Sequence, residues 1–228
     1  MSESLQARST PDRRSFVRGG IAAAAVVTGA AMIPSRATAA NADRLPNLYP
    51  NWNAMLFRSI QDDENKHVDG IRTIITQLGG TPRPSPTFKN LLQPNLVAFG
   101  TVSKALENTG VGAYLGAAPI ILQPSILAAA GSIATIEARH AGYLNVLFNL
   151  DTTTNLFGQA QEFERALTIQ EVVDSASPFV AGLNGGPALT FSTTKSRVND
   201  IAILNFALAL EYLERDFYNL NVPRYYPA

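Results

Sequence analysis

The chain has 228 residues, of which 46% are hydrophobic and 16% charged, and its formal net charge at pH 7 is zero. This length suits one domain with a sizeable core, and the balanced charge excludes a basic surface for nucleic acid. Because cysteine is absent, disulfides, thiolate zinc sites, iron–sulfur clusters and a cysteine nucleophile are excluded. Any metal would need oxygen and imidazole ligands, which favours iron, manganese or zinc over copper(I).

The first 40 residues are predicted to be an export signal. Arg13-Arg14 and Phe16 precede a mildly apolar run over 19–33, and small residues at 36–40 offer a cleavage site. The paired arginines resemble a twin-arginine signal. An ordinary secretory signal or a retained anchor are the alternatives. We expect twin-arginine export to the periplasm or outside the cell, without a stable membrane span after cleavage, and a mature domain over 41–228.

Apolar spacing predicts four long helices in the mature chain. Their predicted ranges are 52–78, 96–118, 125–149 and 201–220. Asp200 or Asn199 is the expected N-cap of the last helix, which should end before Pro223. The connection over 150–198 is predicted to be irregular, apart from a short helix opened by the capping-box pattern Thr168-x-x-Glu171.

Two of these helices carry the same motif, E-x-x-H. Glu64 and His67 form the first copy, Glu137 and His140 the second, and together they use both histidines of the chain. Residues three apart lie on one face of a helix, so each motif can offer a carboxylate and an imidazole to one metal ion. The alternative is that both histidines are structural.

The other two helices each place a glutamate among apolar residues. Glu107 lies in the second helix, and Glu211 follows an almost continuous apolar run over 201–210. A carboxylate on a core-facing stripe is costly unless it is paired or bound to metal. Glu107 as a solvent-facing residue, and Glu214 as the ligand in place of Glu211, are the alternatives. Asp62 and Asp63 are expected to lie on a solvated helix face.

One Glu from each of two helices, with Glu-x-x-His from each of two others, is the pattern of di-iron and di-manganese carboxylate bundles. The segments 107–119, 136–148, 176–191 and 203–218 resemble ferritin-like proteins of bacteria, plants and fungi that are labelled desiccation- or stress-related. The resemblance implies an all-α, ferritin-like four-helix bundle with two divalent metal ions, iron or manganese, or else zinc. The ligands that it implies are Glu64, His67, Glu107, Glu137, His140 and Glu211.

We expect Tyr114 and Tyr218 to be core residues or supports of the ligands, with a redox role as the alternative, and the Tyr225-Tyr226 pair to be packing residues. In the family the helix that here carries Glu211 comes first, whereas in this chain it comes last. We interpret this order as a circular permutation, with the ends of the mature chain near each other. A helix swap between the subunits of a homo-oligomer is the alternative.

Two functions fit this pattern. The first is a di-iron or di-manganese oxidoreductase, such as a ferroxidase or a peroxide-consuming enzyme. The second is a metal-stabilised stress protein without turnover, in which metal binding contributes to folding free energy. A storage cage fits less well with export and a long connection, and no nucleic-acid partner is expected.

Overall fold

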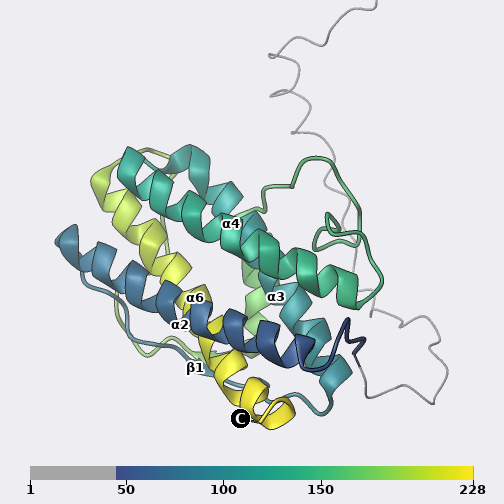
Figure 1. Ribbon diagram of the computed structural model, residues 1–228. Coiled ribbons are helices and arrows are strands. Elements are labelled where there is room, and N and C mark those ends of the chain that lie inside the picture. The colour runs from purple at the N-terminus through teal and green to yellow at the C-terminus, as the bar shows by residue number, and fades with distance from the viewer. Residues whose placement is uncertain (1–44, 228) are drawn as a thin grey trace, which may run out of the picture. The chain divides into compact units, whose positions relative to one another are not determined.

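The computed structural model describes residues 45–227, so the predicted export signal lies outside the described residues. Four long helices form a bundle, which confirms the predicted all-α architecture (Figure 1). They are α2 (Trp52–Gln77), α3 (Leu96–Ala117), α4 (Pro124–Leu147) and α6 (Arg197–Tyr225). None of the helices in the described part is long and apolar enough to cross a membrane.

The shorter elements lie in the two long connections of the bundle. The first connection holds β1 (Thr87–Phe88), and the second holds α5 (Ile169–Ala176), the 3₁₀ turn η2 (Ser177–Phe179) and β2 (Val180–Gly182). A further 3₁₀ turn, η1 (Ala118–Ile120), joins α3 to α4. The capping box predicted at the start of α5 is present.

Hydrogen bonds between helix ends give the helix directions. Arg197, at the start of α6, donates to the carbonyl of Leu78 after α2 (3.1 Å), and Arg58 near the start of α2 donates to the carbonyl of Tyr226 (3.1 Å). Helices α2 and α6 are therefore antiparallel neighbours within one chain, and the end of α6 lies beside the start of α2.

Helix α3 is also antiparallel to α6. Asn221 near the end of α6 accepts from the backbone of Gln93 before α3 (2.9 Å), and Asn199 at the start of α6 donates to the carbonyl of Ile120 (3.5 Å). Helices α2 and α3 thus run parallel, as do α4 and α6, because the short η1 turn reverses the chain between α3 and α4. Each parallel pair needs a long crossover, over 78–95 and 148–196 respectively.

The two crossovers are joined to each other, which the sequence did not predict. Thr87 of β1 pairs with Gly182 of β2 in an antiparallel ladder. Arg83 is 1% exposed, and its Nη2 donates to the carbonyls of Leu183 (3.0 Å) and Gly185 (3.4 Å). A buried cation surrounded by backbone carbonyls holds the long connection against the bundle.

The last helix is longer at both ends than predicted. Its N-cap is Ser196, because Asp200 instead accepts from the backbone amides of Leu122 (2.8 Å) and Gln123 (3.1 Å) just before α4. Ending the helix before Pro223 was also wrong. A proline in the last turn removes only one backbone hydrogen bond, and Tyr225 Oη anchors that turn by donating to the carbonyl of Gln93 (2.6 Å).

Two apolar clusters fill the bundle, one toward each end. Phe57, Phe99 and Phe217 belong to the cluster near the chain ends, and Ile71 and Leu208 belong to the other. As predicted, the terminal tyrosines are packing residues: Tyr226 stacks on Phe57 and Tyr225 on Phe99. The candidate site lies between the two clusters.

Asp200 should be a main support of the α4–α6 contact. Its carboxylate is fully buried and also accepts from the Gln123 side chain (3.0 Å). We expect Asp200→Ala to lower the free energy of unfolding by about 2–4 kcal/mol, because buried donors lose their acceptor. Urea denaturation would measure this. The control Asp69→Ala, at an exposed position on α2, should stay near wild type, and equal stability of both variants would refute the role.

Candidate metal centre

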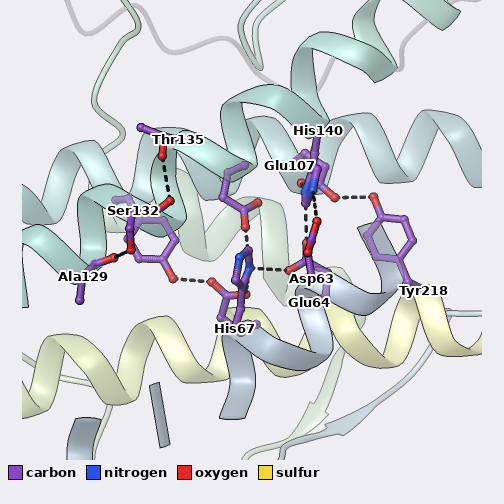
Figure 2. Close-up of polar contacts among 12 residues, drawn as sticks. Asp63, Glu64, His67, Glu107, Ala129, Ser132, Thr135, His140 and Tyr218 are labelled. Carbon is purple, nitrogen blue, oxygen red and sulfur yellow. Dashed lines mark hydrogen bonds and ion pairs between the residues drawn. The ribbon is translucent and has the colours of Figure 1, made fainter. Parts of the chain in front are cut away.

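The six predicted side chains converge in the middle of the bundle. Glu64, Glu107 and Glu137 are fully buried, and Glu211 is 1% exposed. Each of the four long helices contributes one of these carboxylates, and α2 and α4 add the two histidines. Figure 2 shows His67 and His140 reaching into the cluster, with Tyr218 directed at Glu107.

His67 faces three carboxylates with a single ring nitrogen. Its Nδ1 lies 3.1 Å from Glu137 Oε1, 3.2 Å from Glu64 Oε2 and 3.3 Å from Glu211 Oε2. One N–H group cannot donate well to three acceptors at once. Glu64 Oε1, Glu211 Oε2 and both oxygens of Glu137 lack a hydrogen-bond donor of acceptable geometry.

His140 occupies the matching position on α4. Its Nδ1 lies 3.0 Å from Glu107 Oε2 and 3.2 Å from Glu64 Oε1, and its Nε2 lies 3.3 Å from Asp63 Oδ2. The expectation that Asp63 lies on a solvated face is therefore wrong, because its half-buried carboxylate turns toward the ring of His140. Asp62, by contrast, is exposed and pairs with Lys66.

Two tyrosines hold the carboxylates that come from α3 and α6. Tyr218 donates to Glu107 Oε1 (2.5 Å), and Tyr114 donates to Glu211 Oε1. Each tyrosine follows a glutamate by seven residues, which is about two helical turns. Because α3 and α6 are antiparallel, the tyrosine of each helix reaches the glutamate of the other. The repeated E-x₆-Y spacing is the feature of the sequence that could have predicted these two hydrogen bonds between α3 and α6.

A glycine makes room for the cluster on α3. A Cβ atom at Gly110 would lie 2.9 Å from Glu137 Oε2, closer than such contacts allow. Gly110 lies one turn after Glu107, so it shares the inner face of α3. The sequence pattern assigned no role to Gly110 and predicted a solvated position for Asp63, because nothing local distinguishes a glycine or an aspartate that faces a neighbouring helix.

The charges of the cluster are balanced by protons in the absence of metal. Burial alone would lower the pKa of His140, but Glu107 and Glu64 outweigh it and raise that pKa to about 11. Burial and then the charge of Glu107 raise the pKa of Glu64 to about 7. The pKa of His67 also lies far above its ordinary value, because hydrogen bonds to Glu137 and Glu211 outweigh its burial.

The cluster forms two groups that could each hold a metal ion. The first is Glu64, His67, Glu137 and Glu211, and the second is Glu64, Glu107, Glu137 and His140. Within each group, one ligand atom per residue lies within 4.8 Å of all the others. Ligands of one ion lie up to about 4.2 Å apart when each is about 2.1 Å from it, so small side-chain rotations suffice. The carboxylate oxygens that lack hydrogen-bond donors could instead coordinate divalent cations, so the residues present fit a metal site.

Glu214 lies outside both groups. It is 4% exposed, one turn beyond Glu211 on α6, and lines a cavity beside the cluster. Among residues 45–227, no lysine or arginine forms an ion pair with any carboxylate of the cluster. The carboxylates are thus buried without a fixed cationic partner, which is a costly arrangement unless another cation supplies the charge.

A sequence model of the ferritin-like domain family matches residues 21–150, more than half of the chain. The matched range includes α2, α3 and α4, with five of the six clustered side chains, and ends before α5 and α6. No curated protein and no solved structure matches the chain.

The metal-free protein should lose stability as pH rises. Folding raises the pKa of His140 from 6.5 to about 11, so its contribution is complete below about pH 6.5 and is lost toward pH 11. The raised pKa of Glu64 also makes stability fall as pH rises, between pH 4.5 and about pH 7. We expect the Tm of chelator-treated protein to be lower at pH 9 than at pH 6.

Differential scanning calorimetry from pH 6 to pH 9 would measure how steeply the Tm falls with pH. His140→Gln should flatten it, whereas Asp62→Asn, on the exposed side of α2, should leave it unchanged. A Tm that rises from pH 6 to pH 9 in the metal-free protein would contradict the assignment of these protons.

Proposed function

The chain belongs to the ferritin-like domain family, and on this premise we propose that its clustered side chains hold two divalent metal ions and that the loaded protein is an oxidoreductase. The metals would be iron or manganese, with zinc as a third option. The proposed ligands are Glu64, His67, Glu107, Glu137, His140 and Glu211. The observation that carries the proposal is the convergence of three buried carboxylates on one imidazole nitrogen.

The two groups of donors suggest a division of roles. Glu64 and Glu137 belong to both groups, so they are the residues that would be shared between the ions. His67 with Glu211, and His140 with Glu107, would each serve one ion. Iron or manganese bound there would supply one-electron redox chemistry, which the side chains of the cluster lack.

The residues around the cluster would orient the ligands and exclude water. Tyr114, Tyr218 and Asp63 each hold one ligand by a hydrogen bond, as outer partners commonly do in metal sites. The apolar clusters on either side keep the centre dry, which strengthens every charge interaction inside it. Ferroxidase activity, peroxide disproportionation and oxidation of a small substrate are the candidate reactions.

A metal-stabilised stress or desiccation-related protein without turnover is the second candidate. The buried carboxylates without lysine or arginine partners favour it equally, because metal binding would then contribute directly to folding free energy. As part of the same proposal, residues 1–40 direct twin-arginine export, and the mature protein acts in the periplasm or outside the cell.

The helix order fits a circular permutation of the family's bundle. The family match ends at residue 150, and α6 returns antiparallel to α2 with its end beside the start of α2. We expect a chain in which 197–226 precedes residue 45 through a short linker to fold and bind the same number of metal ions. An unfolded product, tested beside the unaltered chain, would count against the permutation.

Metal content per chain tests the ligand assignment. Anaerobic loading with Fe²⁺ or Mn²⁺, followed by elemental analysis, should give two ions per wild-type chain. His67→Ala and His140→Ala should each retain one ion, because each histidine belongs to one group. Glu64→Ala should lose both.

Helical content by circular dichroism would confirm that the variants remain folded. Glu162→Gln, at an exposed position outside the bundle, should still bind two ions. Undiminished binding of two ions by both histidine variants would rule out the proposed centre.

Redox turnover separates the two candidate functions. Stopped-flow absorbance after mixing Fe²⁺-loaded protein with dioxygen or peroxide should show oxidation faster than free Fe²⁺ under the same conditions. Glu64→Ala should abolish the acceleration, whereas Glu162→Gln should keep it. A large metal-dependent rise in Tm, without oxygen or peroxide consumption by either metal form, would identify the stabilised stress protein instead.

A further inference from the structure

A partly open cavity of about 280 Å³ lies beside the proposed metal centre. The second half of α3, the start of α4 and the middle of α6 form its walls, and the segment entering α5 covers it together with Phe191. The lining side chains are mostly aliphatic, and the helix positions that open the space are small, among them Ala113, Ala130 and Ala207.

The segment that enters α5 packs against α3 at two glycines of that helix. A Cβ atom at Gly112 would lie 2.4 Å from the side chain of Leu167, and one at Gly116 would lie 2.3 Å from the Leu167 carbonyl. The Leu167 amide also donates to the Gly112 carbonyl (2.9 Å). This segment therefore packs directly on the α3 backbone and closes one side of the cavity.

The polar end of the cavity is the metal centre itself. Glu211, Glu214, Tyr114 and Gly110 line this end. Because Gly110 has no side chain, Glu137 lies directly against this part of the cavity wall. Glu214 is 4% exposed, and within residues 45–227 its carboxyl forms no hydrogen bond or ion pair. Glu211 Oε2 also lacks a donor. Two buried acceptors thus border the apolar space at one end.

We propose that this cavity binds an uncharged apolar molecule that bears one hydroxyl group, held with the hydroxyl toward Glu211 and Glu214. An apolar cavity of about 150 Å³ stays dry and takes up benzene, so a space about twice as large suits a two-ring aromatic or a medium-length aliphatic alcohol. A hydroxyl can donate to these carboxyl oxygens, whereas an anion has no hydrogen to donate and loses its hydration on entering the apolar space.

Binding of such a molecule does not depend on the proposed metal function. Only its role as a substrate rests on that function. The position of the cavity places an occupant against Glu211, a proposed ligand of one ion, and away from Asp63 at the opposite side of the cluster. The class of substrate would then be an apolar alcohol, and the molecule would exclude water from the Glu211 side of the centre.

Three naphthalene derivatives of nearly equal size test the proposal. Fluorescence titration of metal-free and Mn²⁺-loaded full-length protein with 2-naphthol, naphthalene and 2-naphthoate should give the tightest Kd for 2-naphthol. We expect 2-naphthoate to bind at least about tenfold more weakly. Equal affinity for all three, or no saturable binding of 2-naphthol, would overturn the proposal.

Variants locate the bound molecule. Ala207→Leu on α6 and Ala130→Leu on α4 should each weaken 2-naphthol binding at least about tenfold by filling the space. Ala128→Leu, at an exposed position on the same helix as Ala130, should bind as wild type does. Glu214→Gln should narrow the difference between 2-naphthol and 2-naphthoate. Wild-type affinities in both filling variants would place the binding elsewhere and refute the assignment.

The two proposals fail in different ways. Two metal ions per chain without 2-naphthol binding would refute the cavity assignment alone. Saturable 2-naphthol binding that the filling variants abolish, in a protein that holds no metal, would refute the metal centre alone.

Discussion

The structure depends on one constraint: the buried carboxylates in the middle of the bundle have more acceptor oxygens than there are hydrogen-bond donors to reach them. Four carboxylates meet between two apolar clusters, and the donors that reach them are two imidazole nitrogens and two tyrosine hydroxyls. A buried acceptor without a donor is expensive, and a buried charge more so. Without metal, protons on the histidines and on part of the carboxyls offset the charge of this carboxylate cluster, but several of its oxygens still lack a donor. Two divalent cations would satisfy it more completely, since each can face several oxygens at once.

The centre is built from two pairs of antiparallel helices with matching spacings. On α2 and α4 the repeated spacing is Glu-x-x-His, and on α3 and α6 it is Glu-x₆-Tyr. In each pair the second residue of one helix reaches the glutamate of the other: His67 meets Glu137, and Tyr218 meets Glu107. Reversing the direction of one helix would separate these partners. The two long crossovers, joined by the β1–β2 ladder, are what allow the required directions.

The clustered side chains are arranged symmetrically, but their surroundings are not. On one side, Asp63 holds the outer nitrogen of His140, close to the surface. On the other, Glu211 borders an apolar cavity together with Glu214, a carboxyl that belongs to neither group of donors. The two halves of the centre therefore differ in access and polarity, so the two ions would experience different environments. A difference of this kind gives an otherwise symmetric site one face suited to an apolar molecule.

The sequence by itself determined the four helices and the short capped helix, because helical periodicity and capping are local properties that tertiary contacts here reinforce. The E-x-x-H spacing pointed to four of the side chains that converge, and the family resemblance added Glu107 and Glu211. The sequence also pointed to Tyr114 and Tyr218. The ends of α6 were misjudged, because Asp200 and Pro223 take their roles from α4 and from the loop before α3. Only the tertiary structure placed Asp63 on His140, Gly110 against Glu137, and the cavity beside Glu211. Each of these depends on which helix lies opposite, and that information is absent from any single segment of the chain.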